Sequence, residues 1–423
     1  MTQGDPHNLS RTLERSVQKI SETEDLSNKD KNLIQRFNDH LITQDLSDSR
    51  ISRHLQCIRI IGEATDQDLL LDTRSQINRV VGIINKNNLK EQDLSDSTKA
   101  EYRKTLNKFV GGFLTSMRKE IDGLDNDMDG RKLMKGITST APSTKPDPDQ
   151  LPTPNTVRSL VENANNKRDK AMIMTLWSTG GRIGEILGLK WKDIKFKRRK
   201  SEEIVQVTFK DTKTGVDRKV PFRGGITFLA EWKRESSESD NPESFAFHNL
   251  RTGEQIGYKS SRKVIQRAAS NADQEFERKL NPHAFRKARA TFLAAKGMNQ
   301  ATLCDYMGWV QGSDQAAVYI GLAESDKEDS ILELAGLEVN DEEEKKDLDP
   351  VRCTECSELN PFLAETCNGC GKALDSGDLY AHMEIQDKKD EFKNQVIMSE
   401  TKFTPENINE KAKEFVRDEL DLS

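Results

Sequence analysis

The stretch from residue 137 to residue 153 is rich in proline, serine and threonine and shows no hydrophobic periodicity. Such a composition cannot bury enough apolar surface to fold by itself, so it indicates a linker. A chain of 423 residues is long enough for roughly two or three domains. We therefore expect a multidomain protein, with one body before residue 137 and at least one after residue 153.

Charge is distributed unevenly along the chain, although the net charge is only −6. Residues 1–150 carry 23 basic and 24 acidic side chains, whereas residues 151–320 carry 30 and 19, a net charge of +11. Residues 321–423 carry 12 and 28, a net charge of −16. Ordinary variation of solvated surface can produce such a split, but a strongly basic middle part favours contact with phosphates.

The region of residues 1–136 is expected to be a helical bundle. Apolar residues recur every three or four positions from Leu33 to Leu41 and again from Ile51 to Ile61. Two more helices are expected over about residues 66–87 and 98–118. This pattern alone is compatible with any helical domain. Basic residues are spread over the polar faces: Lys31, Arg36, Arg50, Arg53, Arg59, Arg103, Lys104 and Lys108.

Two motifs of the basic middle part suit an anionic ligand. Arg182 stands next to glycines at the start of an amphipathic helix, where the backbone can approach an anion. Residues 204–209 and 218–222 are expected to be two strands of a hairpin, with Lys213 near its tip. Either motif taken alone is compatible with an ordinary surface ion pair.

A third motif adds groups that can react. His283 and Arg286 lie three residues apart, so a helix presents both on one face, and Trp309 and Tyr319 follow. Arginine binds phosphate oxygens, histidine moves a proton and tyrosine can form a covalent bond. Taken singly, these residues are compatible with a solvated helix face, a core tryptophan and a surface aromatic.

One ordered set of side chains resembles the tyrosine recombinase, or integrase, family over roughly residues 160–322: Arg182, Lys213, His283, Arg286, Trp309 and Tyr319. The sequence looks most like integrases of archaeal viruses and mobile elements, in which tryptophan can replace a more usual histidine. It departs from the family pattern at Gly181, where a larger apolar residue is common. Tyr319 also follows Trp309 by ten residues, one more than the commonest spacing.

The resemblance implies a site-specific recombinase that cuts and rejoins DNA through a 3′-phosphotyrosine, with no cofactor in catalysis. Tyr319 would attack the scissile phosphate. Arg182 and Arg286 would hold its non-bridging oxygens, and Lys213 would protonate the departing 5′ oxygen.

The remaining roles follow in the same way. His283 would be a general base or a second phosphate donor, and Trp309 would pack against the site. Glu185 is expected to support Arg182 without reacting. Tyr306 is the nearby competitor for the nucleophile, but it precedes Trp309, whereas the family's nucleophile follows that position.

The resemblance also implies a division of labour and a set of partners. Residues 1–136 would be a helical core-binding domain that clamps DNA, residues 137–153 a linker, and residues 154–340 an α+β catalytic domain with a small antiparallel sheet. The partners would be double-stranded DNA, a homotetramer on two DNA sites, and accessory DNA-bending or directionality proteins. The sequence has no run of about twenty apolar residues and no signal-peptide core, so we expect a cytoplasmic, DNA-associated protein without membrane contact.

Three other functions use similar residues. A chromosome-dimer resolvase shares the chemistry, and a type IB topoisomerase-like enzyme uses the same residue types without a defined site. A zinc-containing DNA-binding regulator could keep the fold and lack the activity.

The last part of the chain contains a predicted zinc ribbon at residues 341–375 and an acidic helical tail at residues 376–423. Two CxxC pairs stand ten residues apart, a spacing typical of four thiolates that bind structural Zn²⁺: Cys353, Cys356, Cys367 and Cys370. Paired disulfides are the less favoured alternative in an intracellular protein. Because the surroundings are acidic, we expect the ribbon to contact protein more than DNA.

Overall fold

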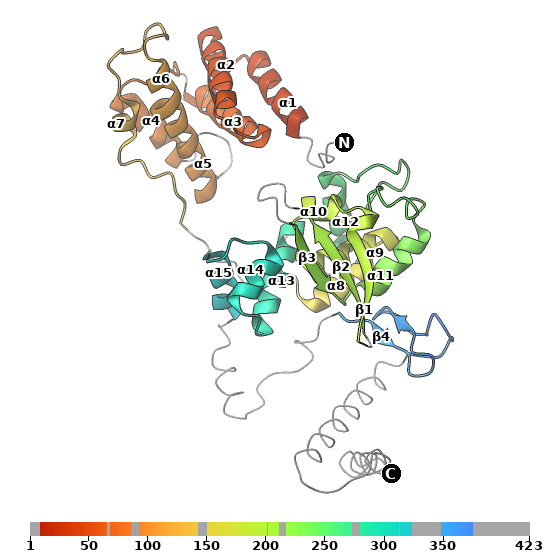
Figure 1. Cartoon of the computed structure of the whole chain (residues 1–423). Helices are drawn as coiled ribbons and strands as arrows, with labels where there is room; N and C mark the ends of the chain where they lie inside the picture. The colour runs from red at the N-terminus through yellow and green to blue at the C-terminus, as the bar shows by residue number, and fades with distance from the viewer. Residues whose placement is uncertain are drawn as a thin grey trace, which may run out of the picture. The chain divides into compact units, whose positions relative to one another are not determined.

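The computed structural model describes residues 9–65, 68–86, 89, 93–142, 150–200, 202–210, 217–272, 280–312, 314–323 and 348–374. The chain divides into two compact units, one within residues 1–145 and the other within residues 146–423 (Figure 1). The fold is mostly helical with a small antiparallel sheet, as expected from the sequence. Among the described residues, no helix combines the length and the apolar character needed to cross a membrane.

In the described residues of the first unit, all the regular elements are helices. They are α1 (Leu9–Glu22), α2 (Asn28–Thr43), α3 (Asp48–Thr65), α4 (Arg74–Asn85), α5 (Asp96–Asn107), the π-helical turn η1 (Lys108–Leu114), α6 (Thr115–Met117) and α7 (Gly130–Met134).

Local signals set where these helices begin. The Ser27 hydroxyl accepts from the backbone N–H of Asp30 at the start of α2. The helix expected from residue 66 begins only at Arg74, because Thr73 and Gln76 form a reciprocal capping box there. The expected stripes of α2 and α3 are buried, and Phe37 packs edge-on against Phe109 with ring centroids 5.0 Å apart. The first unit therefore has an apolar core of its own.

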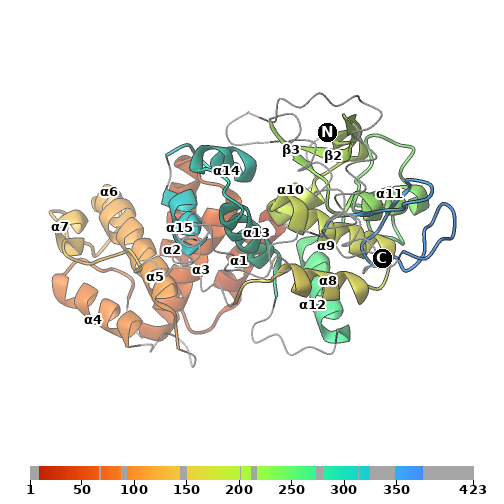
Figure 2. The same cartoon turned by 90° about the horizontal axis from the view of Figure 1, so that it is seen from below.

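The second unit surrounds the buried helix α9 (Lys167–Thr179) with a sheet and further helices (Figure 2). Its helices are α8 (Pro154–Glu162), α9 (Lys167–Thr179), α10 (Ile183–Leu187), η3 (Trp191–Asp193), α11 (Ile226–Glu235), α12 (Tyr258–Asn271), α13 (Pro282–Ala295), α14 (Gln300–Met307) and α15 (Asp314–Ala323). Its strands are β1 (Ile194–Arg199), β2 (Glu202–Phe209), β3 (Arg218–Phe222), β4 (Val351–Arg352) and β5 (Leu359–Asn360).

The three-stranded sheet is antiparallel in the order β1-β2-β3, with Ile194 opposite Val207 and Val205 opposite Phe222. The two expected strands correspond to β2 and β3, while β1 has no counterpart in the sequence-based expectation. Helix α9 is buried along nearly its whole length and ends at Gly180, whose φ of 57° is the left-handed conformation that favours glycine. This end of α9 delivers the chain to the candidate site.

The cysteine-bearing segment belongs to the second unit and packs against its core. Leu348 is 3% exposed within the core of that unit, and the ring of Phe362 lies 5.3 Å from the ring of Phe228. The guanidinium of Arg158, on α8, lies 4.8 Å from the centroid of the same Phe362 ring. The segment is thus packed onto the apolar core formed by the rest of its own unit. The expected helices of residues 376–423 lie outside the described residues.

Candidate active site and metal centre

Arg286 is the buried centre of the candidate active site. Asn281 caps α13 by accepting from the backbone N–H of His283, which fixes the helix one turn before Arg286. The Arg286 side chain is 5% exposed and donates to the carbonyl of Gly180 at 2.8 Å and to the carbonyl of Met307. Burial lowers the pKa of Arg286 to about 10, so the guanidinium stays protonated at neutral pH. A permanent positive charge is thereby held between the ends of α9 and α14.

Trp309 contacts both this charge and the candidate nucleophile. Its ring centroid is 5.4 Å from the Arg286 guanidinium, and its ring stacks on Tyr319 with a centroid distance of 5.3 Å and an interplanar angle of 8°. Tyr319 on α15 is 7% exposed. Burial raises the pKa of the Tyr319 phenol, and the positive charge of Arg286 opposes that rise. The phenol, the indole and the guanidinium therefore form one cluster.

Glu185 on α10 forms ion pairs with two further arginines, Arg182 just before α10 and Arg218 on β3. One carboxylate oxygen accepts from Arg182 Nη1 at 2.9 Å, and the other accepts from the Arg182 backbone N–H at 2.7 Å. That second oxygen also pairs with Arg218 Nη2 at 2.7 Å. The Arg182 side chain is 54% exposed and the Arg218 side chain is 11% exposed. The outer arginine is therefore open to a ligand, and the inner one is enclosed by protein.

His283 lies one turn before Arg286 on α13, at the exposed edge of this cluster. Partial burial lowers the pKa of its imidazole, and the charges of Lys287, Arg286 and Arg182 lower it further. The imidazole is therefore mainly neutral at pH 7 and able to accept a proton.

The competitor tyrosine is already committed to the fold. The Tyr306 hydroxyl donates to the carbonyl of Ser178, while the Tyr306 carbonyl accepts from Arg218. Tyr306 is thus held as a structural link between α9 and α14. Lys213 lies outside the described residues, in the connection between β2 and β3.

Arg218 is the residue that the sequence-based analysis missed at this site. A signal was present, because the alternation in β3 places Arg218 on the same face as the buried Val220 and Phe222. A charge on the buried face of a strand needs a partner. Glu185 is that partner, but the sequence does not show that the two meet.

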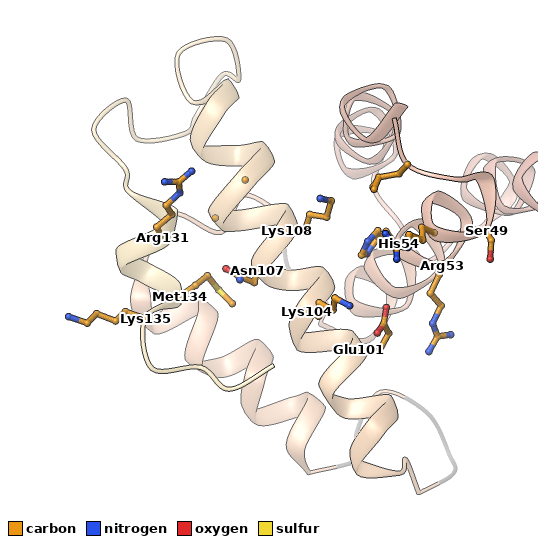
Figure 3. Close-up of a pocket in the computed structure, with 14 residues that line it drawn as sticks. Ser49, Arg53, His54, Glu101, Lys104, Asn107, Lys108, Arg131, Met134 and Lys135 are labelled. Carbon is orange, nitrogen blue, oxygen red and sulfur yellow. The ribbon is translucent and has the colours of Figure 1, made fainter. Parts of the chain in front are cut away.

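A second group of basic residues lines an open pocket of about 880 Å³ in the first unit (Figure 3). Six arginine and lysine side chains line this pocket, and in the described part of the chain none of the six forms an ion pair. One carboxylate, that of Glu101, lines the same pocket. They come from α3, the helix formed by α5 and η1, and the chain at and after α7: Arg50, Arg53, Lys104, Lys108, Arg131 and Lys135.

The other cations expected on the faces of this unit serve its fold. Arg36 pairs with Glu120 at 3.6 Å, and Arg59 forms an ion pair with Glu63 at 2.5 Å. Arg103 donates to the side chain of Asn85 and the carbonyl of Thr138, and Lys31 donates to the carbonyl of Ser21. The structure thus separates cations that hold helices together from cations that face open space.

The four cysteines form the one group of three or more metal-binding side chains found among the described residues, and their sulfur atoms lie within 4.8 Å of one another. Two of the sulfur–sulfur distances are 3.6 Å (Cys353 to Cys370) and 3.5 Å (Cys356 to Cys367). Tetrahedral Zn²⁺ with Zn–S bonds of about 2.3 Å needs sulfur atoms about 3.8 Å apart. The backbone N–H of Gly369 points at Cys367 Sγ at 3.4 Å, a contact that suits a thiolate. The donor set fits a closed, structural metal site.

The chain is similar to known DNA recombinases. A family model described as the phage integrase family matches residues 152–325. The tyrosine recombinase XerC of Corynebacterium efficiens is 28% identical over 143 residues, which make up 34% of this chain and 43% of that protein. A tyrosine recombinase of Pseudothermotoga lettingae is 24% identical over 310 residues, or 71% of this chain and 98% of that protein. The chain thus spans less than half of the first relative and nearly all of the second.

A similar fold occurs in the crystal structure of a lambda integrase dimer bound to a COC′ core site. That structure is 16% identical in sequence, has a TM-score of 0.51, and covers 68% of this chain and 76% of its own. At this level of identity the likeness concerns the fold alone.

Proposed function

The chain belongs to the tyrosine recombinase family, and on this premise we propose that it cuts and rejoins DNA at a specific site through a covalent tyrosine intermediate. The observation that carries the proposal is the continuous cluster of Arg286, Trp309 and Tyr319. It brings the candidate nucleophile to a buried, permanently charged guanidinium within a single chain.

The reaction exchanges one phosphodiester for another. The Tyr319 oxygen loses its proton and forms a bond to the scissile phosphorus, while the bond to the 5′ oxygen breaks and a 5′-hydroxyl leaves. Attack of a 5′-hydroxyl on the phosphotyrosine reverses these steps and rejoins the strand. No cofactor is required, because the ester to tyrosine conserves the phosphodiester bond energy.

Two arginines stabilise the charge that grows on the non-bridging oxygens. A guanidinium carries five N–H donors, so Arg286 can serve its two carbonyl partners and still donate to a phosphate. Arg182 meets the same phosphate from the open side. In this proposal His283 accepts a proton or donates to the phosphate, and Lys213 protonates the leaving oxygen.

Trapping of the covalent intermediate tests this function. A duplex with a nick next to the scissile phosphate releases a short fragment after cleavage, so the protein–DNA adduct accumulates and is detected on a denaturing gel. The wild-type chain should form the adduct, Tyr319→Phe should form none, and the matched control Tyr306→Phe should still form it. An adduct with Tyr319→Phe would refute the role of Tyr319. No adduct with the wild-type chain on its own site would favour a DNA-binding regulator.

We propose further that residues 1–136 act as the core-binding domain and that their basic pocket grips the DNA backbone. The support is the set of open cations around the pocket, in which Lys104 and Lys108 lie one turn apart along one helix and Arg53 extends from α3 (Figure 3). Residues 154–340 would then be the catalytic domain. A homotetramer on two DNA sites, with accessory DNA-bending or directionality proteins, completes the proposal for a DNA-associated protein of the cytoplasm. The mass of the protein–DNA complex in solution tests the tetramer, and a complex containing at most two chains would contradict it.

The four cysteines are proposed to hold one structural Zn²⁺, which would cross-link the segment around β4 and β5. The purified chain should contain about one equivalent of zinc per chain, as four-thiolate sites do. Cys356→Ser should lose the zinc, while Cys57→Ala, which removes a buried cysteine outside the cluster, should keep it. Chelation should expose this segment to proteases because the metal supplies its folding energy. A metal-free chain with an equally resistant segment would contradict the proposal.

A further inference from the structure

Arg218 has no role in the reaction described so far, yet it is enclosed next to the groups that perform it. Its guanidinium pairs with Glu185, lies 4.7 Å from the ring centroid of Phe209, and donates to the carbonyl of Tyr306. Burial lowers the pKa of Arg218, and the carboxylate of Glu185 opposes that effect. An arginine in such a place is retained at an energetic cost unless its charge is compensated.

The charges around Glu185 explain what this arginine can do. If Glu185 paired with Arg182 alone, its negative charge would cancel the charge of the guanidinium that is open to a phosphate. The carboxylate instead pairs with Arg182 through one oxygen and with Arg218 through the other. Two positive charges share one negative charge, so the group as a whole stays positive.

Arg218 also reaches the other side of the site. The last carbonyls of a helix have no partner within the helix, and α14 ends at Met307. Arg218 donates to the carbonyl of Tyr306, and Arg286 donates to the carbonyl of Met307. Gly308 follows with a φ of 64°, and a Cβ there would lie 3.1 Å from Arg218 Nε. The buried Arg286 and the largely enclosed Arg218 therefore fix the turn that leads to Trp309.

We propose that Arg218 is a positioning residue of the cleavage site: it neutralises Glu185, which orients Arg182, and so keeps the charge of Arg182 available for the scissile phosphate. Arg218 itself does not touch the DNA. The inference rests on the proposed cleavage function and adds a residue to its machinery.

A double-mutant cycle on the nicked duplex tests the inference, with single-turnover adduct formation and DNA affinity measured for each variant. Arg218→Gln should slow cleavage by about 100-fold, the size of effect seen when one charge-stabilising donor is lost. Its DNA affinity should change little. If the fault is the uncompensated carboxylate, adding Glu185→Gln should restore the rate by about tenfold or more, a coupling that independent losses would not show.

Two further results keep the test decisive. Arg218→Lys preserves the charge beside Glu185 and should stay within about tenfold of the wild-type rate, although it loses the bidentate fork. It replaces Arg218→Gln if that variant does not fold, and a 100-fold loss with lysine would then overturn the inference. Double-variant cleavage no faster than that of Arg218→Gln would overturn it as well. If the wild-type chain forms no adduct, the proposed function falls first and this inference falls with it.

Discussion

The basic side chains around the pocket of the first unit and those of the candidate active site hold their charge in opposite ways. In the first unit, six cations line an open pocket, and none of them forms an ion pair with the residues that the structure describes. In the second unit, Arg218 and Arg286 are enclosed and bonded to carbonyls or to a carboxylate, and Arg182 is tied to Glu185. One cluster is solvated, and the other is built into the fold.

This difference separates affinity from chemistry. When solvated lysines and arginines contact DNA phosphates, counterions are released from the DNA. The binding energy gained in this way is weakened by salt and depends little on where each cation lies on the protein. A buried guanidinium is held in one place by its hydrogen bonds. It therefore stabilises the charge that develops at one defined point in the transition state. We expect substitutions in the first cluster to change DNA binding and substitutions in the second to change the cleavage rate.

The largest expected effect is in the second cluster. Arg286→Ala should lower single-turnover cleavage by about 1,000-fold or more, because a charge-stabilising donor is lost and two carbonyls lose their partner. DNA affinity at low salt should stay within about threefold, because most phosphate contacts lie elsewhere. Arg251→Ala, which removes an exposed arginine of the same unit, serves as the control and should cleave normally. An equal loss of affinity and rate would remove the contrast between the clusters.

A smaller effect is expected in the first cluster. The triple variant Arg53→Gln, Lys104→Gln and Lys108→Gln should weaken DNA binding by about 100-fold at moderate salt and reduce the salt slope by about three. Cleavage at saturating protein should be unchanged. The control is Arg36→Gln, which removes a cation already paired with Glu120 and should bind normally. An unchanged salt slope in the triple variant would show that the pocket does not meet phosphates.

The smallest expected effect is the pH dependence that His283 gives to the cleavage rate. Burial and the charges of Lys287, Arg286 and Arg182 lower the pKa of His283 below its ordinary value of 6.5, so the imidazole gains its proton at a lower pH than a free histidine does. If His283 accepts a proton in cleavage, the rate should be flat from pH 8 to about 6.5 and fall several-fold on further acidification. His283→Gln should cleave more slowly and lack this fall. A wild-type rate that rises on acidification would instead favour His283 as a charged phosphate donor.

Much of the local structure was predictable from the sequence. The apolar stripes of α2 and α3 and the strands β2 and β3 depend on side chains close in the chain, and the structure confirms them. Strand β1 was missed because its residues are mostly charged and, after Ile194, exposed, so it lacks the alternation of a half-buried strand. The start expected for α4, at about residue 66, was wrong. That expectation followed the apolar residues, whereas the capping pair Thr73 and Gln76 sets the start at Arg74.

The candidate site shows the same limit at longer range. The sequence by itself determined the residue types, their order along the chain and the spacing of the four cysteines, since each can be read from positions close in the chain. Only the tertiary structure decided that Arg286 bonds to Gly180, 106 positions away, and that Glu185 is shared with Arg218, 33 positions away. These contacts arise where packed helices and a strand bring their ends together, and no local pattern records which charged groups will meet there.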